Sequence, residues 1–175
     1  MVNKYMKKII VFTTALLTTL IVLVGCSLSN TPTSKVEELF SKYQKLDSDI
    51  TKEIDSLLAT ETLTNEQQER YRNLIMNQYR NLTYEIKDEE IDGDIAVVTT
   101  QIEVLDYRKA ISELNTETTT NYDILEYNNK KLDKLEKVKE KVAYTLELNV
   151  VKDDNGNWKL SNLSSVDIKK IQGMY

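Results

Sequence analysis

The chain has 175 residues and a formal net charge of −5, with one cysteine and no histidine. Without histidine, the usual serine and cysteine triads, histidine zinc sites and a histidine pH switch are excluded. A single cysteine excludes an internal disulfide framework. The acidic excess argues against nucleic acid as a partner, because phosphates repel a negatively charged surface.

Residues 1–25 are predicted to be a lipoprotein signal peptide. Three lysines precede the apolar run IIVFTTALLTTLIVLV, which is the order of a secretory signal and is shorter than the about 20 residues of a spanning helix. Leu23-Val24-Gly25-Cys26 then resembles the lipobox of bacterial lipoproteins. The resemblance implies cleavage between Gly25 and Cys26, a diacylglyceryl thioether on Cys26 and usually acylation of the new amino terminus. The alternative is an ordinary signal peptide or signal anchor with an incidental cysteine.

Removal of this leader would leave 150 residues, with 20 basic against 28 acidic side chains and a formal charge of −8. Residues 26–33 are predicted to be the lipidated cysteine and a flexible tether, and residues 34–175 a single domain, which is long enough to bury a core. Two acyl chains hold a protein on a bilayer where one holds only marginally. We therefore expect a domain anchored to the cell membrane on its extracytoplasmic side.

Two amphipathic helices are predicted in the first part of the domain. Residues 34–58 carry apolar side chains every three or four positions, which indicates one helix, bent near Asp47. Ser34 with Glu37 is a possible capping box at its start, and Thr64 with Gln67 is a second box that opens the next helix. The expected buried face of the second helix is Tyr71, Leu74, Ile75, Tyr79 and Leu82.

The apolar period then changes from 3.6 to 2, which predicts a hairpin between residues 82 and 107 that turns at Asp92-Gly93. Its expected inner face in the second arm is Ala96, Val98, Ile102 and Val104. Thr99, Gln101 and Glu103 fall on the opposite face, which should be wet or line a polar cavity.

Residues 108–121 are harder to interpret, with a short helix over RKAISELN followed by an irregular polar stretch. Residues 122–142 have helical spacing and predict a third long helix, with Glu126–Lys130 and Asp133–Lys137 as favourable pairs. A second hairpin follows over residues 142–163, with its turn at Asn155-Gly156. A last short helix is expected to be capped by Ser164 or Ser165 and stopped by Gly173.

This order of elements indicates an α+β fold, in which a bent, antiparallel, four-stranded sheet made of two hairpins packs against long helices. The stretches TPTSKVEELFSKY, YEIKDEEIDGDIAVVTTQIEV and YTLELNVVKDDNGNWKLSNLS resemble the nuclear transport factor 2-like, cystatin-like domains found in lipoproteins of Gram-positive bacteria. The resemblance implies helices around a strongly bent sheet, often with a cone-shaped cavity. It also implies an extracytoplasmic binding or accessory module.

Candidate site residues are few. Tyr107, Tyr122 and Tyr127 flank the irregular stretch and are the best candidates to line or cover a pocket, because tyrosine combines a flat apolar ring with a polar tip. The acidic cluster DEEIDGD has a calcium-loop spacing at its start but has Thr99 where the bidentate glutamate belongs, so a solvated turn is favoured. No catalytic residue, metal ligand or cofactor is predicted.

Three function classes are open. The first is a non-catalytic module that binds a small ligand or peptide in the cavity between sheet and helices. The second is a structural or protein-interaction module that uses the exposed face of the sheet, and the third is an enzyme with carboxylate and tyrosine chemistry. The expected partners are the lipid bilayer through Cys26 and a small ligand, peptide or envelope protein, with no nucleic acid.

Overall fold

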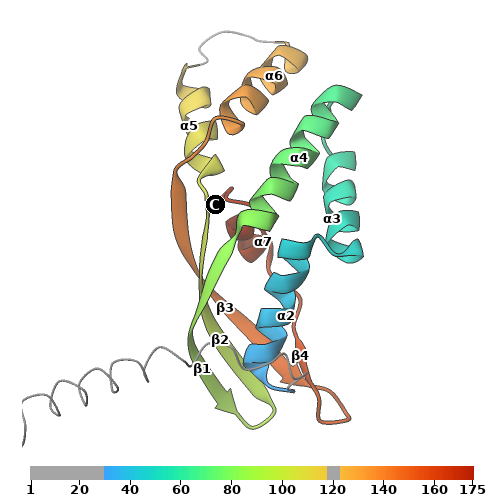
Figure 1. The fold of residues 1–175 in the computed structure, drawn as a ribbon, viewed down its shortest axis with the longest axis vertical. Coiled ribbons are helices and arrows are strands. Elements are labelled where there is room, and N and C mark those ends of the chain that lie inside the picture. The colour runs from blue at the N-terminus through green and yellow to red at the C-terminus, as the bar shows by residue number, and fades with distance from the viewer. Residues whose placement is uncertain (1–29, 118–122) are drawn as a thin grey trace, which may run out of the picture.

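The computed structural model describes residues 30–117 and 123–175. The helices of these residues are α2 (Pro32–Lys45), α3 (Ser48–Ala59), α4 (Asn65–Asn81), α5 (Tyr107–Glu117), α6 (Ile124–Leu135) and α7 (Ser165–Ile171). The strands are β1 (Thr83–Asp92), β2 (Ile95–Leu105), β3 (Lys141–Lys152) and β4 (Trp158–Leu160). They form one four-stranded antiparallel sheet in the order β1-β2-β3-β4, which confirms the predicted α+β fold class (Figure 1).

The sheet is covered on one face. Helices α2, α3 and α4 lie to one side of the strands, while α5 and α6 form a separate pair beyond the far end of β2 and β3 (Figure 1). The predicted inner residues of β2 are at most 2% exposed, and Thr99, Gln101 and Glu103 on the other face are half-buried or exposed. The alternation read from the sequence therefore assigned the two faces correctly.

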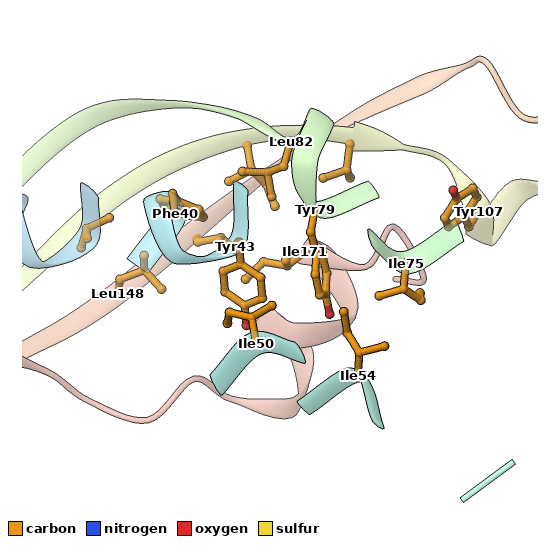
Figure 2. Close-up of a cluster of buried hydrophobic side chains, with 14 of the residues drawn as sticks. Phe40, Tyr43, Ile50, Ile54, Ile75, Tyr79, Leu82, Tyr107, Leu148 and Ile171 are labelled. Atoms are coloured by element: carbon orange, nitrogen blue, oxygen red, sulfur yellow. The ribbon is translucent and has the colours of Figure 1, made fainter. Parts of the chain in front are cut away.

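The core lies between the helices and the inner face of the sheet. The side chains that fill it come from four helices and two strands and are at most 2% exposed: Val36, Phe40, Tyr43, Ile54, Ile75, Tyr79, Ile102, Leu146 and Ile171. Figure 2 shows the rings of Tyr43 and Tyr79 in this layer; they meet edge to face with centroids 4.8 Å apart. The five predicted buried residues of the second helix are all in this core.

The prediction of one bent helix over residues 34–58 was wrong, because the chain breaks into α2 and α3. Leu46 closes α2 in the left-handed conformation, with φ 53°, and Asp47 caps α3 by accepting a hydrogen bond from Asp49 N at 2.9 Å. The first capping box was also misplaced. Thr31 is the N-cap of α2 and pairs with Ser34, so the helix begins before the residues that were expected to cap it.

The third helix is shorter than predicted. The helix ends at Leu135, and Val142 belongs to β3. The apolar residues between them keep a helical spacing by chance, although they do not form a helix. Of the two predicted pairs, Glu126 and Lys130 form an ion pair at 3.2 Å, whereas Asp133 pairs with Arg70 of α4 at 2.7 Å. The tertiary contact to α4 was not visible in the local pattern.

The remaining turns follow the sequence closely. The Thr64–Gln67 capping box is present, and Ser164 caps α7. The turn between β1 and β2 uses Gly93 and Asp94, one residue later than expected, with Gly93 at φ 61°. Gly173 ends the chain's last helix at φ 69°, a conformation that favours glycine.

Buried amides fasten the helices to one another and to the sheet. Gln78 of α4 binds both backbone groups of Leu105, at 3.0 Å each, where β2 ends. Gln67 donates to Leu125 O at 3.0 Å, and Asn128 of α6 donates to Thr62 O at 2.8 Å. Because these polar side chains are buried and satisfied, they fix the position of the α5–α6 pair beside α4.

Candidate functional site

The outer face of the sheet is the face that the described helices leave uncovered (Figure 1). Register pairs Glu85 with Gln101, Thr99 with Glu147 and Gln101 with Thr145, so these side chains lie side by side across three strands. A hollow of about 340 Å³ lies on this face. Its lining residues are Thr83, Tyr84, Glu85, Gln101, Ile102, Glu103 and Ala143. The surface therefore offers hydrogen-bonding and acidic groups on three adjacent strands of the sheet.

Acidic side chains outnumber basic ones on this outer face. The carboxylates are those of Glu85, Asp88, Glu90, Glu103 and Glu147. Lys141 pairs with Glu103 at 2.8 Å, and Lys87, at the irregularity of β1, pairs with Glu85 at 2.5 Å. These pairs are exposed and contribute little to stability. Their net negative field favours a partner with basic groups.

A second hollow lies between α5, the end of α6 and the start of β3. Its volume is about 420 Å³, with Ala110 and Val138 among its lining residues. Four lysines and three acidic residues surround it, so its charges nearly cancel. Lys109 pairs with Glu140 at 2.5 Å, and this hydrogen bond raises the pKa of Lys109. The groove is open to solvent and suits a short peptide or a small polar molecule better than a strongly charged anion.

A carboxylate and two tyrosines meet inside the helical layer. Figure 2 shows the hydroxyls of Tyr43 and Tyr79 directed toward α3, near Ile50 and Ile54. Glu53 lies between those isoleucines in the sequence of α3, and its Oε1 is buried without a hydrogen-bond partner. Burial raises the pKa of Glu53, and the nearby Tyr43 hydroxyl lowers it in part.

The tyrosine hydroxyls in this cluster are held in the protonated form. Burial raises the pKa of Tyr43 well above its ordinary value, with a further contribution from the negative Glu53. Burial also raises the pKa of Tyr79, whose hydroxyl accepts a hydrogen bond from Gln172 Nε2 at 3.4 Å. Both tyrosines are 1% exposed, which leaves no access for a substrate. The cluster therefore acts on stability and not on a bound molecule.

The three predicted pocket tyrosines do not come together in the described residues. Tyr107 is fully buried, its hydroxyl donates to Leu74 O at 3.4 Å, and burial raises its pKa to about 12. Tyr127 is half-buried and donates to Asn115 Oδ1 at 2.9 Å, which joins α6 to α5. Tyr122, like Gly25 and Cys26, lies outside the described residues.

One long-range contact of the predicted tether was missed by sequence reasoning. Asn30 was assigned to a flexible tether, yet its side chain is fastened to the β3–β4 turn. Short polar residues next to a proline are typical of linkers, so only the long-range contact shows its role.

Residues 30–117 and 123–175 hold no group of three or more acidic or cysteine side chains arranged around a metal position. Over the same residues, no helix has both the length and the apolar character needed to cross a bilayer.

No family model and no curated protein matches the chain. Among solved structures, it is similar to YcdA of Bacillus subtilis, a candidate lipoprotein, with 16% sequence identity and a TM-score of 0.42. The match covers 74% of this chain and 46% of YcdA, so the chain spans about half the length of that protein. A likeness this distant carries no argument about the function of this chain.

Proposed function

We propose that this chain is a lipid-anchored, extracytoplasmic protein-interaction module that binds its partner through the outer face of the sheet. The observation that carries the proposal is the contrast between the two faces. The space between sheet and helices, where a ligand cavity was expected, is occupied by core side chains such as Phe40, Tyr79 and Ile171, each at most 1% exposed. None of the described helices lies over the opposite face (Figure 1).

The chemistry of the outer face suggests the kind of partner. Threonine, glutamine and asparagine side chains offer hydrogen bonds, and the excess of carboxylates favours a protein surface rich in lysine or arginine. Charge complementarity of this kind sets specificity and association rate more than affinity. The resemblance to nuclear transport factor 2-like lipoprotein domains supports the same placement, as an accessory module at the cell envelope.

The anchor is the second part of the proposal. Replacement of Cys26 by alanine is expected to abolish metabolic labelling with radioactive palmitate and to leave the leader uncleaved. Replacement of Ser29, a polar residue of the predicted tether, by alanine is the control and should leave labelling intact. Undiminished labelling of the Cys26→Ala chain would contradict the lipid anchor.

The contact surface is tested by photocrosslinking in living cells. A photoreactive amino acid at Thr145, which is exposed on the outer face, is expected to give a discrete crosslinked product. The same photoreactive amino acid at position 52, where Lys52 is exposed on α3, is the control and should give no crosslinked product. Glu147→Lys should weaken the Thr145 product by disturbing the adjacent acidic surface. A product from Lys52 alone would place the interaction on the helical side and refute the proposed face.

A second candidate is binding of a small ligand or short peptide in the groove beside α5. It is favoured by the size of the hollow, about 420 Å³, which is within the range of small-molecule sites. Val138→Trp would fill this groove and should block a ligand there without affecting the outer face. A loss of crosslinking at Thr145 in the Val138→Trp chain would argue that both surfaces serve one partner.

A further inference from the structure

The chain that leads to the membrane anchor is fastened to one end of the sheet. Asn30 Oδ1 accepts a hydrogen bond from Trp158 N at 2.8 Å. Asn30 Nδ2 donates to Gly156 O and to Asn157 Oδ1, both at 3.3 Å. One side chain thus makes three bonds to the β3–β4 turn, 126 to 128 residues further along the chain.

A second fastening follows three residues later. Thr33 N and Thr33 Oγ1 donate to Glu89 Oε2 of β1, at 2.8 and 2.7 Å. In the sequence, Cys26 precedes Asn30 by four residues. A fully extended chain covers at most about 3.5 Å per residue, so a lipid on Cys26 stays within about 14 Å of Asn30. A tether this short cannot let the domain turn over freely.

The end of the sheet beside Asn30 carries exposed apolar side chains. We name this end, formed by the β1–β2 turn and the β3–β4 turn, the turn end (Figure 1). Ile91 and Ile95 are 55% and 57% exposed, and Val151, opposite Ile95 in the register, is 38% exposed. Lys152 joins the two turns, because its Nζ donates to Gly93 O at 3.3 Å.

We propose that the turn end is the surface that rests on the lipid bilayer, with Asn30 as the clamp that holds it there. Two independent observations coincide: the place where the described chain leaves toward Cys26, and the apolar side chains Ile91, Ile95 and Val151 at that same place. The occupant of this surface is the headgroup region of the membrane. The inference depends on the proposed lipid anchor.

The contact is apolar and not electrostatic. Asp94 pairs with Lys152 at 2.9 Å, and Asp153 pairs with Lys159 at 3.3 Å, which reduces the charge of both turns. Asp92 and Asp154 remain at the turns and oppose contact with anionic lipid. The turn end should therefore insert more deeply into zwitterionic vesicles than into anionic vesicles at low salt.

This orientation presents the proposed partner surface to the outside. The twelve residues of β3 rise by about 3.3 Å each, so the strand extends about 40 Å from the turn end. The outer face then stands upright on the membrane, and the α5–α6 pair lies farthest from it. A partner can approach Glu147 and Thr145 from the side without displacing lipid.

The full-length lipidated chain in phosphatidylcholine vesicles tests the proposal. The Cys26 sulfur is bonded to the lipid in the anchored chain, so a cysteine introduced as Ile95→Cys provides the only free thiol. A nitroxide spin label is attached to this thiol. Ser112→Cys, exposed on α5 at the far end, is the matched control. The readout is the collision frequency with oxygen, which is enriched in lipid, relative to that with a water-soluble nickel chelate.

We expect the ratio of oxygen to nickel collisions to be several-fold higher at position 95 than at position 112, and to fall when Asn30→Ala is added. If the chain mass includes the lipid but the collision ratios at positions 95 and 112 are equal, the proposed orientation of the domain on the membrane is overturned and the lipid anchor is not. An unchanged ratio in the Asn30→Ala chain would overturn the clamp. A mass that corresponds to an unmodified Cys26 would refute the anchor as well. A higher ratio in vesicles with phosphatidylglycerol would show an electrostatic contact and contradict the apolar one.

Discussion

Gly173 is expected to be the glycine least tolerant of substitution. Its φ is 69°, and a Cβ there would overlap the carbonyl oxygen of Leu105 and lie 2.5 Å from Gln78 Nε2. The Gly173 carbonyl also accepts a hydrogen bond from Arg108 N at 2.8 Å. Substitution by alanine therefore disturbs the point where α7, β2, α4 and α5 meet.

The magnitude follows from three contributions. Left-handed backbone costs an alanine about 1–2 kcal/mol. Overpacking adds about 1–3 kcal/mol, and loss of the Gln78–Leu105 hydrogen bonds adds about 1–3 kcal/mol. Gly156 has φ 79° and nothing within 4 Å of an added Cβ, so Gly156→Ala incurs only the first cost. We expect Gly173→Ala to lower the free energy of unfolding by at least about 2 kcal/mol more than Gly156→Ala does.

Urea denaturation of the two variants, followed by far-ultraviolet circular dichroism, measures this difference directly. For a chain of this size, about 2 kcal/mol corresponds to a melting temperature lower by about 4–8 °C. Equal unfolding free energies for Gly173→Ala and Gly156→Ala would refute the reasoning, because the close approach to Leu105 would then have no cost.

Three further predictions concern stability. Burial raises the pKa of Glu53 in the folded chain, so the protonated carboxyl stabilises the fold below the unfolded pKa, and this contribution is lost as pH rises through the folded pKa. Glu53→Gln should therefore raise the melting temperature at pH 7 and leave it nearly unchanged at pH 4. A lower melting temperature of this variant at pH 7 would contradict the reasoning. Thr64→Ala removes the cap of α4 and should cost about 1 kcal/mol in urea denaturation; no change would show that the capping box is dispensable. Arg70→Ala removes exposed pairs with Asp133 and Glu136, and a loss above about 1 kcal/mol in the same assay would contradict their expected weakness.

The sequence predicts those features whose signals are local. Strand alternation assigned the faces of β2, and the Thr64–Gln67 box and Gly173 marked helix ends, because each depends on residues close together in the chain. The break at Leu46 was missed because a leucine rarely adopts a left-handed conformation, and the apolar spacing continues across it.

The candidate site was harder to predict for the same physical reason. Tyr79 follows the helical period of α4 and was expected in the core, whereas Tyr107 is buried by its packing against α4, which no local pattern showed. The hydrogen bond between Asn30 and Trp158 joins residues that are 128 positions apart in the sequence, and no local periodicity predicts such a contact. The open outer face was expected, since its polar residues alternate with buried ones along β2.

The central claim, a protein partner at the outer face, is tested most directly by native mass spectrometry of the lipidated chain released from its own membranes in mild detergent. We expect a complex with a second protein in the original chain, a marked loss of that complex in Glu147→Lys, and its retention in Glu69→Lys, the same charge reversal on exposed α4. A single chain that carries a small added mass, lost on denaturation and unaffected by Glu147→Lys, would contradict the claim and favour a ligand-binding module.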